Sequence, residues 1–225
     1  MTAEQLRSKV FTDLEEKGFY PAKSLPLPDV GIAIRPAAEV AARLMALDAL
    51  FTWVAYSEED VASERLEKYI DQNRLRNWLV KDESKILTLS RTKAHKAHAN
   101  NIGWRLENMW ALAWVLGFEP EPDLEAAQVG NDVTKPMIYE FLPGLDGTIE
   151  QLLAKTTPRS ADEVIAMEYR FYCAHNAVRS AQLGGKTVPE DFHPIIHGGA
   201  VHERRHSLSW CIAPDVTWDE TDLNT

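Results

Sequence analysis

The sequence is poor in cysteine and in basic residues. Cys173 and Cys211 are the only cysteines among 225 residues, so the chain lacks a disulfide framework, and both fit buried positions in a reducing cytosol. Lys and Arg number 24 against 34 Asp and Glu, which gives a net charge of −10. This deficit of cations argues against a non-specific nucleic-acid binder, which must displace phosphate counterions. It permits a basic protein partner.

Long apolar runs are also missing. No stretch reaches the roughly 18 apolar residues that a membrane span needs. The most apolar segment, residues 102–118, is interrupted by Arg105 and Glu107. The N-terminal segment MTAEQLRSKVFTDLEEKG has no apolar core of a secretory signal. We therefore expect a cytoplasmic protein without contact with a membrane.

The motifs of the commonest cofactor and catalytic sites are absent. The chain has no G-x-x-x-x-G-K-[ST] loop, no G-x-G-x-x-G, no G-x-S-x-G and no C-x-x-C. These absences argue against the common nucleotide-binding, serine-hydrolase and thiol-redox proteins. The sequence thus implies no cofactor.

Apolar residues recur at helical spacing, whereas the period-two alternation of strands is almost missing. Ser57 with Asp60 and Ser160 with Glu163 resemble capping boxes at helix starts, and Gly117 suits a helix end. We predict helices over about 3–18, 37–56, 57–79, 82–89, 92–117, 147–155, 160–183 and 195–212, with a short one at 137–141. This pattern predicts an all-α protein.

The expected architecture is a single-domain, irregular helical bundle around a central Trp-rich helix, which lies within residues 102–117. Within the domain of residues 1–225, we expect an N-terminal helical part over about 1–117 and a C-terminal helical part over about 160–225. The connector between them, about 118–159, is rich in loops, with four prolines between Phe118 and Pro143.

Three predicted helices carry ionisable side chains within their apolar faces. The spacing i, i+4, i+7, i+11 gives one polar stripe on helix 160–183: Glu168, Tyr172, His175 and Arg179. The other two helices extend this candidate polar cluster with Arg105, Glu107, Glu203 and Arg204. An unpaired buried charge is costly, so these groups are expected either to pair in a network that fixes helix register or to border a polar pocket.

A pocket lined by these groups would permit catalysis. In that alternative, Glu107 or Glu203 acts as general base, and Arg179 or Arg204 binds an anion. We expect these side chains to lie close to one another.

The segment His202-Glu203-x-x-His206 matches the H-E-x-x-H pattern of zinc proteases. His193 and His197 are also four residues apart, which adds two possible zinc ligands. However, the two intervening positions are arginines, which would repel a dication, and no third ligand follows at a familiar spacing. A metal-binding hydrolase is therefore kept as an alternative only.

Three segments carry a family resemblance. NIGWRLENMWALAWVLGF resembles the W-R-x-E-x-x-W-x-L-x-W-x-L-G signature of a widespread bacterial family, the domain of unknown function 4272. DEVIAMEYRFYCAHNAVRSAQLGGKTVP is similar to a helix of that family with a Tyr-Arg pair and a following Gly-Lys turn, and HGGAVHERRHSLSWCIAPDVTWDE looks like its closing segment. The resemblance covers most of the chain. It implies an all-helical, cytoplasmic bacterial protein without an established activity.

The family pattern overlaps the polar cluster that helical spacing selects. It falls on Trp104, Arg105, Glu107, Trp110, Trp114, Tyr169, Arg170, Arg179, Glu203, Arg204, Trp210, Trp218 and Asp219. His202 departs from the pattern, in which an aromatic Tyr is usual, and this weakens the zinc alternative.

Our leading hypothesis is a non-enzymatic, acidic module that binds another protein, such as an immunity-type or accessory partner of a basic toxin or enzyme. The alternatives are the enzyme and the metal-binding hydrolase described above, and a homo-oligomer joined through exposed Trp53, Trp78 and Trp218. The sequence does not determine the oligomeric state.

Overall fold

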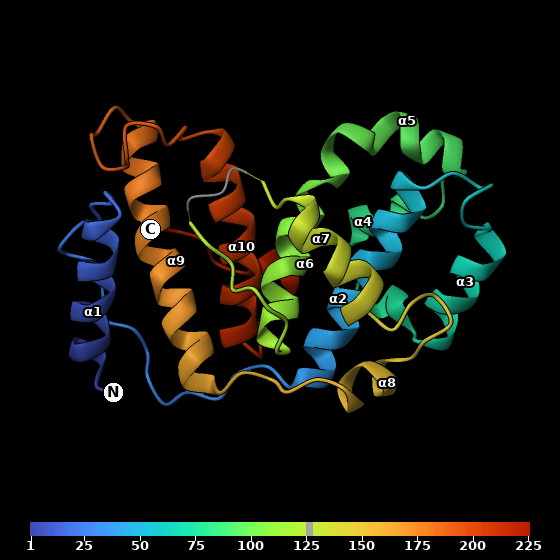
Figure 1. Ribbon diagram of the computed structural model, residues 1–225, viewed down its shortest axis with the longest axis horizontal. Helices are drawn as coiled ribbons and strands as arrows, with labels where there is room; N and C mark the ends of the chain where they lie inside the picture. The colour runs from blue at the N-terminus through green and yellow to red at the C-terminus, as the bar shows by residue number, and fades with distance from the viewer. Residues whose placement is uncertain (125–127) are drawn as a thin grey trace. The chain divides into compact units, whose positions relative to one another are not determined.

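The computed structural model describes residues 1–124 and 128–225, and within these ranges every regular element is helical (Figure 1). The predicted all-α fold is therefore confirmed. The chain packs as two units, each formed by segments that are distant in sequence. Unit 1 comprises Met1–Arg35, Pro122–Gln128 and Arg159–Thr225, and unit 2 comprises Pro36–Glu121 and Val129–Pro158.

The elements divide between the units as follows. Unit 1 contains α1 (Ala3–Glu16), α9 (Ala161–Gln182), α10 (Ile196–Ile212) and the short η3 (Trp218–Glu220). Unit 2 contains α2 (Ala37–Ala55), α3 (Ser63–Gln72), η1 (Leu75–Trp78), α4 (Lys81–Ile86), α5 (Arg91–Ile102), α6 (Trp104–Val115), α7 (Asn131–Pro136), η2 (Met137–Phe141) and α8 (Ile149–Ala154).

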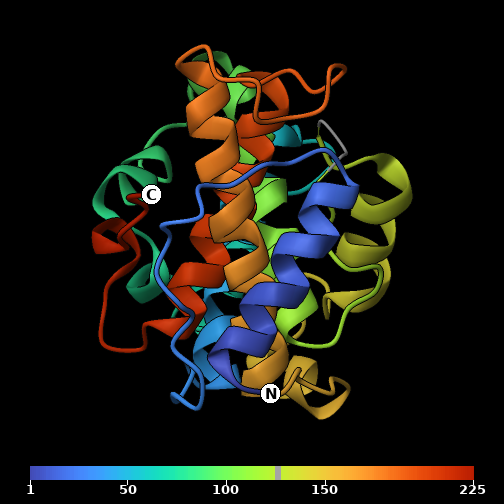
Figure 2. The same ribbon diagram turned by 90° about the vertical axis from the view of Figure 1, so that its left-hand side faces the viewer.

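In unit 1, α9 packs against both α1 and α10 (Figure 2). The predicted Ser160–Glu163 capping box is present and begins α9. Gly198 of α10 faces Val178 of α9, where an added Cβ would lie 2.6 Å from Cγ1 of the valine. The missing side chain therefore lets the two helices approach closely.

The proline-containing connector after α1 crosses α9, as Figure 2 shows. The hydroxyl of Tyr169 donates a hydrogen bond to the carbonyl of Pro26 at 3.0 Å, and the Ala22 amide donates to Oδ1 of Asn176 at 2.8 Å. Arg7 of α1 adds hydrogen bonds to the connector carbonyls of Lys23 and Leu25. These hydrogen bonds hold the connector against α1 and α9.

Arg35 then closes the C-terminal end of α10. Its guanidinium donates to the carbonyls of Trp210, Ala213 and Val216 and lies 3.9 Å from the centre of the Trp210 ring. The last carbonyls of a helix lack partners within the helix, so this arginine serves as a cap supplied from a distant segment.

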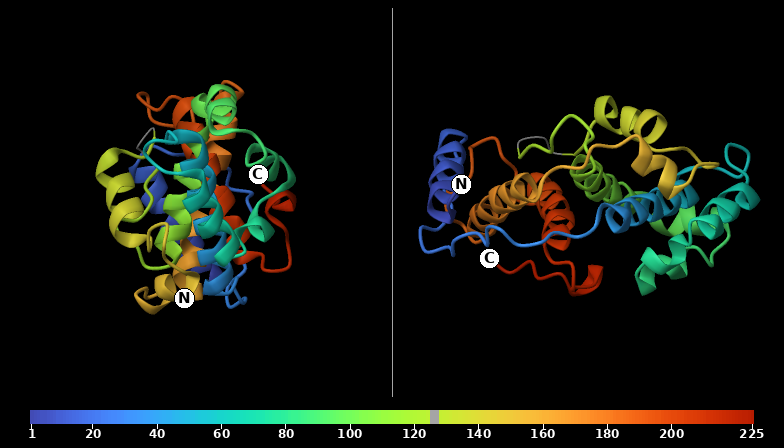
Figure 3. Two further views of the ribbon diagram at one scale, coloured as in Figure 1. Left: turned by 90° about the vertical axis from the view of Figure 1, so that its right-hand side faces the viewer. Right: turned by 90° about the horizontal axis from the view of Figure 1, so that it is seen from below.

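In unit 2, α2 is buried from Val40 to Leu50 and packs against α3, α5, α6 and α8 (Figure 3). The Trp-rich α6 is buried from Glu107 to Val115. The predicted central helix is thus present, and α2 shares the interior of unit 2 with it.

Two charged side chains join α4 to α2. Arg43 donates to both carboxylate oxygens of Glu83, at 2.6 and 2.9 Å, and both side chains are buried. Burial acts to raise the pKa of Glu83, but the charge and hydrogen bonds of Arg43 outweigh it and leave this pKa below its ordinary value.

Three helix predictions differ from the structure. The predicted helix 92–117 is two helices, α5 and α6, which meet at Gly103. Ser57 and Asp60 do exchange capping hydrogen bonds, but they close a turn, and α3 begins only at Ser63 and ends at Gln72. Helix α7 falls where a loop was predicted.

The two units also differ from the N-terminal part, connector and C-terminal part that the sequence predicted. Helix α1, assigned to the part over residues 1–117, packs with α9 in unit 1. Residues 125–127 of the predicted connector lie outside the described residues. That the chain forms a single domain stays a prediction.

Among the described helices, none has the length and apolar character required to cross a membrane.

Candidate functional site

A cleft of about 460 Å³ opens within unit 1. Helices α9 and α10 form its floor, the connector after α1 forms one wall, and the C-terminal segment 216–224 forms another. The polar side chains of the floor are Glu168, Tyr169, Tyr172, Arg205 and Ser209. Glu168 and Tyr172 belong to the polar stripe predicted from the sequence, and Arg205 is the neighbour of the predicted Arg204. This cleft is therefore the candidate functional site.

Glu168 is the buried acid of the cleft, with 9% of its surface exposed. Its Oε1 accepts a hydrogen bond of 2.7 Å from the Ser209 hydroxyl and lies 3.8 Å from Nε of Arg205. Its Oε2 receives no hydrogen bond from any described residue and is reachable from the cleft. Burial raises the pKa of this carboxyl, and the Arg205 charge offsets that effect only in part.

Arg205 ties the C-terminal segment to α9 and α10. Its Nη1 donates to Nδ1 of His175 at 2.7 Å and to the Leu223 carbonyl at 2.8 Å, and its Nη2 donates to the Asn224 carbonyl at 3.2 Å. The guanidinium carbon also lies 4.9 Å from the centre of the Tyr172 ring. Three of the four terminal N–H groups of this arginine are therefore occupied by protein acceptors, while its buried Nε has no hydrogen-bond partner among the described residues.

His175 is held in its neutral form. A guanidinium only donates hydrogen bonds, so Nδ1 must be the acceptor, and the ring proton resides on Nε2. Burial, together with the positive charge of Arg205, lowers the pKa of His175 to about 3. The ring of His202 on α10 lies 5.3 Å from it, measured between ring centres.

An aromatic wall stands beside the acid. The rings of Tyr169 and Tyr172 are nearly parallel, at 27°, with centres 6.1 Å apart. Tyr169 is held by its hydrogen bond to Pro26, so the wall and the connector fix one another.

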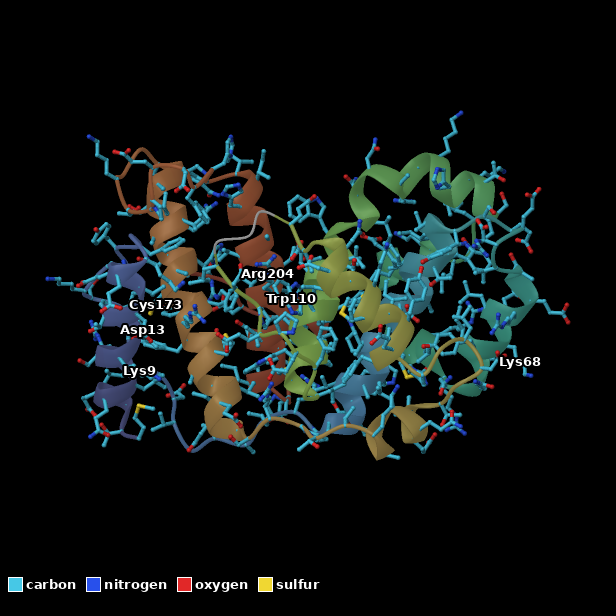
Figure 4. All side chains as sticks on the ribbon, in the orientation of Figure 1. Lys9, Asp13, Lys68, Trp110, Cys173 and Arg204 are labelled. Carbon is cyan, nitrogen blue, oxygen red and sulfur yellow. The ribbon has the colours of Figure 1, made fainter. Side chains whose placement is uncertain are left out.

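The other predicted residues of unit 1 lie elsewhere. Arg204 is fully buried, and its Nη1 donates to the Asp123 carbonyl at 2.7 Å; Figure 4 labels this arginine on α10. Arg179 is exposed and donates to Gln182. Glu203 is half-buried on α10 and does not line the cleft.

Arg105 and Glu107 belong to unit 2. The carboxylate of Glu107, only 1% exposed, accepts the Val129 amide at 2.8 Å. Arg105 lies 3.5 Å from Glu83 and donates to Asn108. On the same helix, the indole of Trp110, labelled in Figure 4, donates to a backbone carbonyl at 2.8 Å.

Sequence reasoning brought Glu168, Tyr172 and His175 together but missed Arg205 and Ser209. Helical spacing contained the signal for the arginine. Position 205 falls on the same stripe of α10 as Val201, Leu208 and Ile212, at i, i+4, i+7 and i+11. An arginine on an apolar stripe needs a buried partner, and Glu168 is that partner.

Three of the four candidate zinc histidines form hydrogen bonds within the protein, and His202 packs against His175. His193 accepts the Ile195 and Ile196 amides through Nδ1, and His197 accepts the His193 amide through Nδ1. Nε2 of His206 is 2.8 Å from the Trp218 carbonyl and must carry the proton there. Across residues 1–124 and 128–225, no three His, Cys, Asp or Glu side chains gather as a possible metal site.

The tryptophans proposed for a homo-oligomer are largely covered. Trp53 is 5% exposed and Trp218 is 6% exposed, while Trp78 is half-buried. The indole of Trp53 donates to the Leu89 carbonyl, and the ring of Trp218 lies against His206. Two of the three side chains therefore offer little surface to a second copy.

Comparison with known proteins connects the chain to one family. The family model described as "Domain of unknown function (DUF4272)" matches residues 6–221. No curated protein and no solved structure matches the chain.

Proposed function

The chain thus belongs to the family described as Domain of unknown function (DUF4272), and we propose that it is a non-enzymatic binding module that recognises a basic protein in the cytoplasm. An immunity-type or accessory partner of a basic toxin or enzyme fits this role. The two cysteines support the compartment, because both are free and buried, as expected in a reducing environment.

One observation carries the proposal: the cleft is strongly acidic. Among the described residues, four carboxylates line it, those of Asp29, Glu168, Glu220 and Asp222, against one guanidinium, that of Arg205. The whole chain has the same sign, with a net charge of −10. Complementary charge accelerates the encounter with a cationic partner and disfavours anionic ones.

Affinity capture tests the proposal. The immobilised wild-type protein should retain a stoichiometric basic protein from a native lysate, and moderate salt should release it. A variant with a neutral cleft rim, Asp29→Asn with Glu220→Gln and Asp222→Asn, should retain much less of it.

A charge-matched control removes three exposed acids of unit 1 away from the cleft, by Glu15→Gln, Asp162→Asn and Glu190→Gln. This control should bind like the wild type. The proposal is wrong if no stoichiometric basic protein is retained, or if the rim variant and the control lose binding equally.

A second candidate is an enzyme in which Glu168 acts as general acid or base. The observation in its favour is that Glu168 is buried at a cleft with its pKa raised, as catalytic carboxylates often are. It predicts turnover of amide or ester substrates that Glu168→Gln abolishes, whereas the binding module predicts none.

A further inference from the structure

We infer that the cleft of unit 1 binds one lysine or arginine side chain of the basic partner, with its cationic end at Oε2 of Glu168. This inference rests on the proposed function and specifies the chemical group that the cleft recognises.

One carboxylate oxygen of Glu168 receives no hydrogen bond from the described residues. Ser209 occupies Oε1 of Glu168, while Oε2 receives no hydrogen bond from a described residue although nine-tenths of the side chain is buried. Oε2 is not among the fully enclosed polar atoms, so a ligand in the cleft can reach it, and a charged N–H donor supplies the strongest hydrogen bond available to it.

The charges that line the cleft do not favour an anion as the ligand. Among the described residues, Arg205 is the one cation that lines the cleft. Three of its four terminal N–H groups already donate to His175, Leu223 and Asn224, and its Nε is buried. An anion would meet at most one remaining terminal N–H of Arg205, and it would lie beside Glu168 and the three rim carboxylates, which repel it. A cation instead meets carboxylates both at the rim and at the floor.

The lining of the cleft also fits an aliphatic chain that carries a positive charge at its end. Apolar side chains line the cleft beside the acid, including Leu27, Ile165 and Ile212, and the Tyr169 and Tyr172 rings form the adjoining wall. Aliphatic carbons pack on such surfaces, and aromatic faces attract cations. An alkyl chain that ends in an ammonium or guanidinium group matches both properties, and such a group occurs on a protein as lysine or arginine.

The experiment is an NMR titration of the ¹⁵N-labelled full chain with small probes at constant ionic strength. The probes are Nα-acetyl-lysine methylamide, its arginine equivalent, the Nε-acetylated lysine compound, 1,5-diaminopentane and propionate. We expect saturable shifts of the Glu168, Tyr172 and Ser209 amides with the lysine or arginine probe and none with acetylated lysine or propionate.

Two variants assign the effect to the buried acid. Glu168→Gln keeps the shape of the side chain and should weaken binding about tenfold or more, as expected for the loss of a charge-assisted hydrogen bond. Glu190→Gln removes the same charge from an exposed loop of unit 1 and should leave affinity unchanged. Asp222→Asn, at the exposed rim, should weaken binding about twofold to threefold and keeps the test valid if Glu168→Gln fails to fold.

Several results would overturn the inference. Binding of the diamine without binding of either amino-acid probe would assign the cleft to a free small amine. Binding of propionate, equal binding of acetylated lysine, or no shift at all would reject a cationic side chain. Lysate capture that succeeds while these probes fail would remove only this inference, whereas probe binding without any captured protein would remove the proposed function.

Discussion

The buried acids of this protein differ in the charged groups and hydrogen-bond donors that surround them. Glu83 meets a bidentate arginine, and its pKa is lowered despite burial. Glu168 lies 3.8 Å from its arginine, and its pKa is raised. Asp48 on α2 receives only a weak hydrogen bond of 3.4 Å from Tyr69, and burial raises its pKa to about 7. The direction in which each carboxyl pKa moves therefore follows from whether a positive partner is present and how close it lies.

Asp48→Asn is expected to change how stability depends on pH. The folded state holds the proton of Asp48 up to about pH 7, whereas the unfolded state releases it near 3.8. The wild type thus loses up to about 1.4 kcal/mol per pH unit as pH rises between these values, and asparagine does not titrate. Urea unfolding at pH 4.5 and 7.5 measures this, and the variant should gain relative to the wild type at the higher pH. An equal difference at both pH values would contradict the assignment.

His175→Gln is also expected to change how stability depends on pH, but here the wild type loses stability as the pH falls. The folded state keeps His175 neutral down to about pH 3, whereas the unfolded state binds a proton near 6.5. Stability from this group is complete above pH 6.5 and falls by up to about 1.4 kcal/mol per pH unit on acidification.

The glutamine Oε1 can accept from Arg205 without titrating, so the variant should lose less stability than the wild type between pH 7 and 5. Thermal unfolding at both pH values checks this, with His98→Gln on α5 as the control. If both variants follow the wild type, the proposed protonation state of His175 is wrong.

Part of the candidate site could be predicted from single positions in the sequence. Helical spacing selects Glu168, Tyr172 and His175, because one helix carries them all. The rim residues Asp29 and Asp222 come from irregular segments before α2 and after α10, and no periodicity places such segments in space. The distance between Arg205 and Glu168 depends on how α9 and α10 pack, which spacing within either helix does not determine.

At the scale of the element, helix ends depend on distant arginines. Arg35 caps α10, as described above, and Arg91 does the same for α2. The guanidinium of Arg91 donates to the carbonyls of Thr52, Trp53 and Tyr56 near the end of α2 and to that of Val61 beyond it. Such caps leave no local sequence signal, because the residues that form them are more than 30 positions apart.

Capping boxes and glycines, by contrast, leave local signals. The Ser160–Glu163 box predicted the start of α9 because side chain and amide are three residues apart. The same reasoning misplaced α3, since the Ser57–Asp60 hydrogen bonds are equally compatible with an isolated turn. The break between α5 and α6 was missed because Gly103 retains helical dihedral angles of −56° and −27°.

Gly117→Ala is expected to destabilise the protein. Gly117 has φ +103°, and an added Cβ would lie 2.4 Å from the Thr157 carbonyl oxygen. Strain and clash together should cost about 2 kcal/mol or more. Gly103→Ala is the matched control, because its φ is helical and nothing lies within 4 Å of the added Cβ. It should gain about 0.5–1 kcal/mol. Urea unfolding of both variants checks these signs, and a neutral Gly117→Ala would refute the argument.

At the scale of the whole molecule, the chain passes repeatedly between its two units. It crosses after residues 35, 121, 128 and 158, so each unit is completed only when later parts of the chain have folded. Repeated crossings make independent folding of either unit difficult. This is the physical basis for expecting a single domain. The sequence did not predict that α1 packs with α9, because the two helices are far apart in the chain.

The single-domain prediction leads to one cooperative unfolding transition. Phe171→Ala in unit 1 and Leu47→Ala in unit 2 each remove a fully buried side chain and should cost about 2–5 kcal/mol. Circular dichroism and tryptophan fluorescence should still report coincident transitions in urea for both variants. Separate transitions, with each variant shifting a different one, would show two domains instead.

The order of the crossings has a practical consequence for anyone who dissects the gene. Residues 36–158 contain all of unit 2, whereas unit 1 is assembled from the stretches that flank and interrupt it. Nested deletions from either terminus therefore dismantle the cleft first. A library of fragments cut in sequential order would sample intact versions of unit 2 many times and of the cleft almost never.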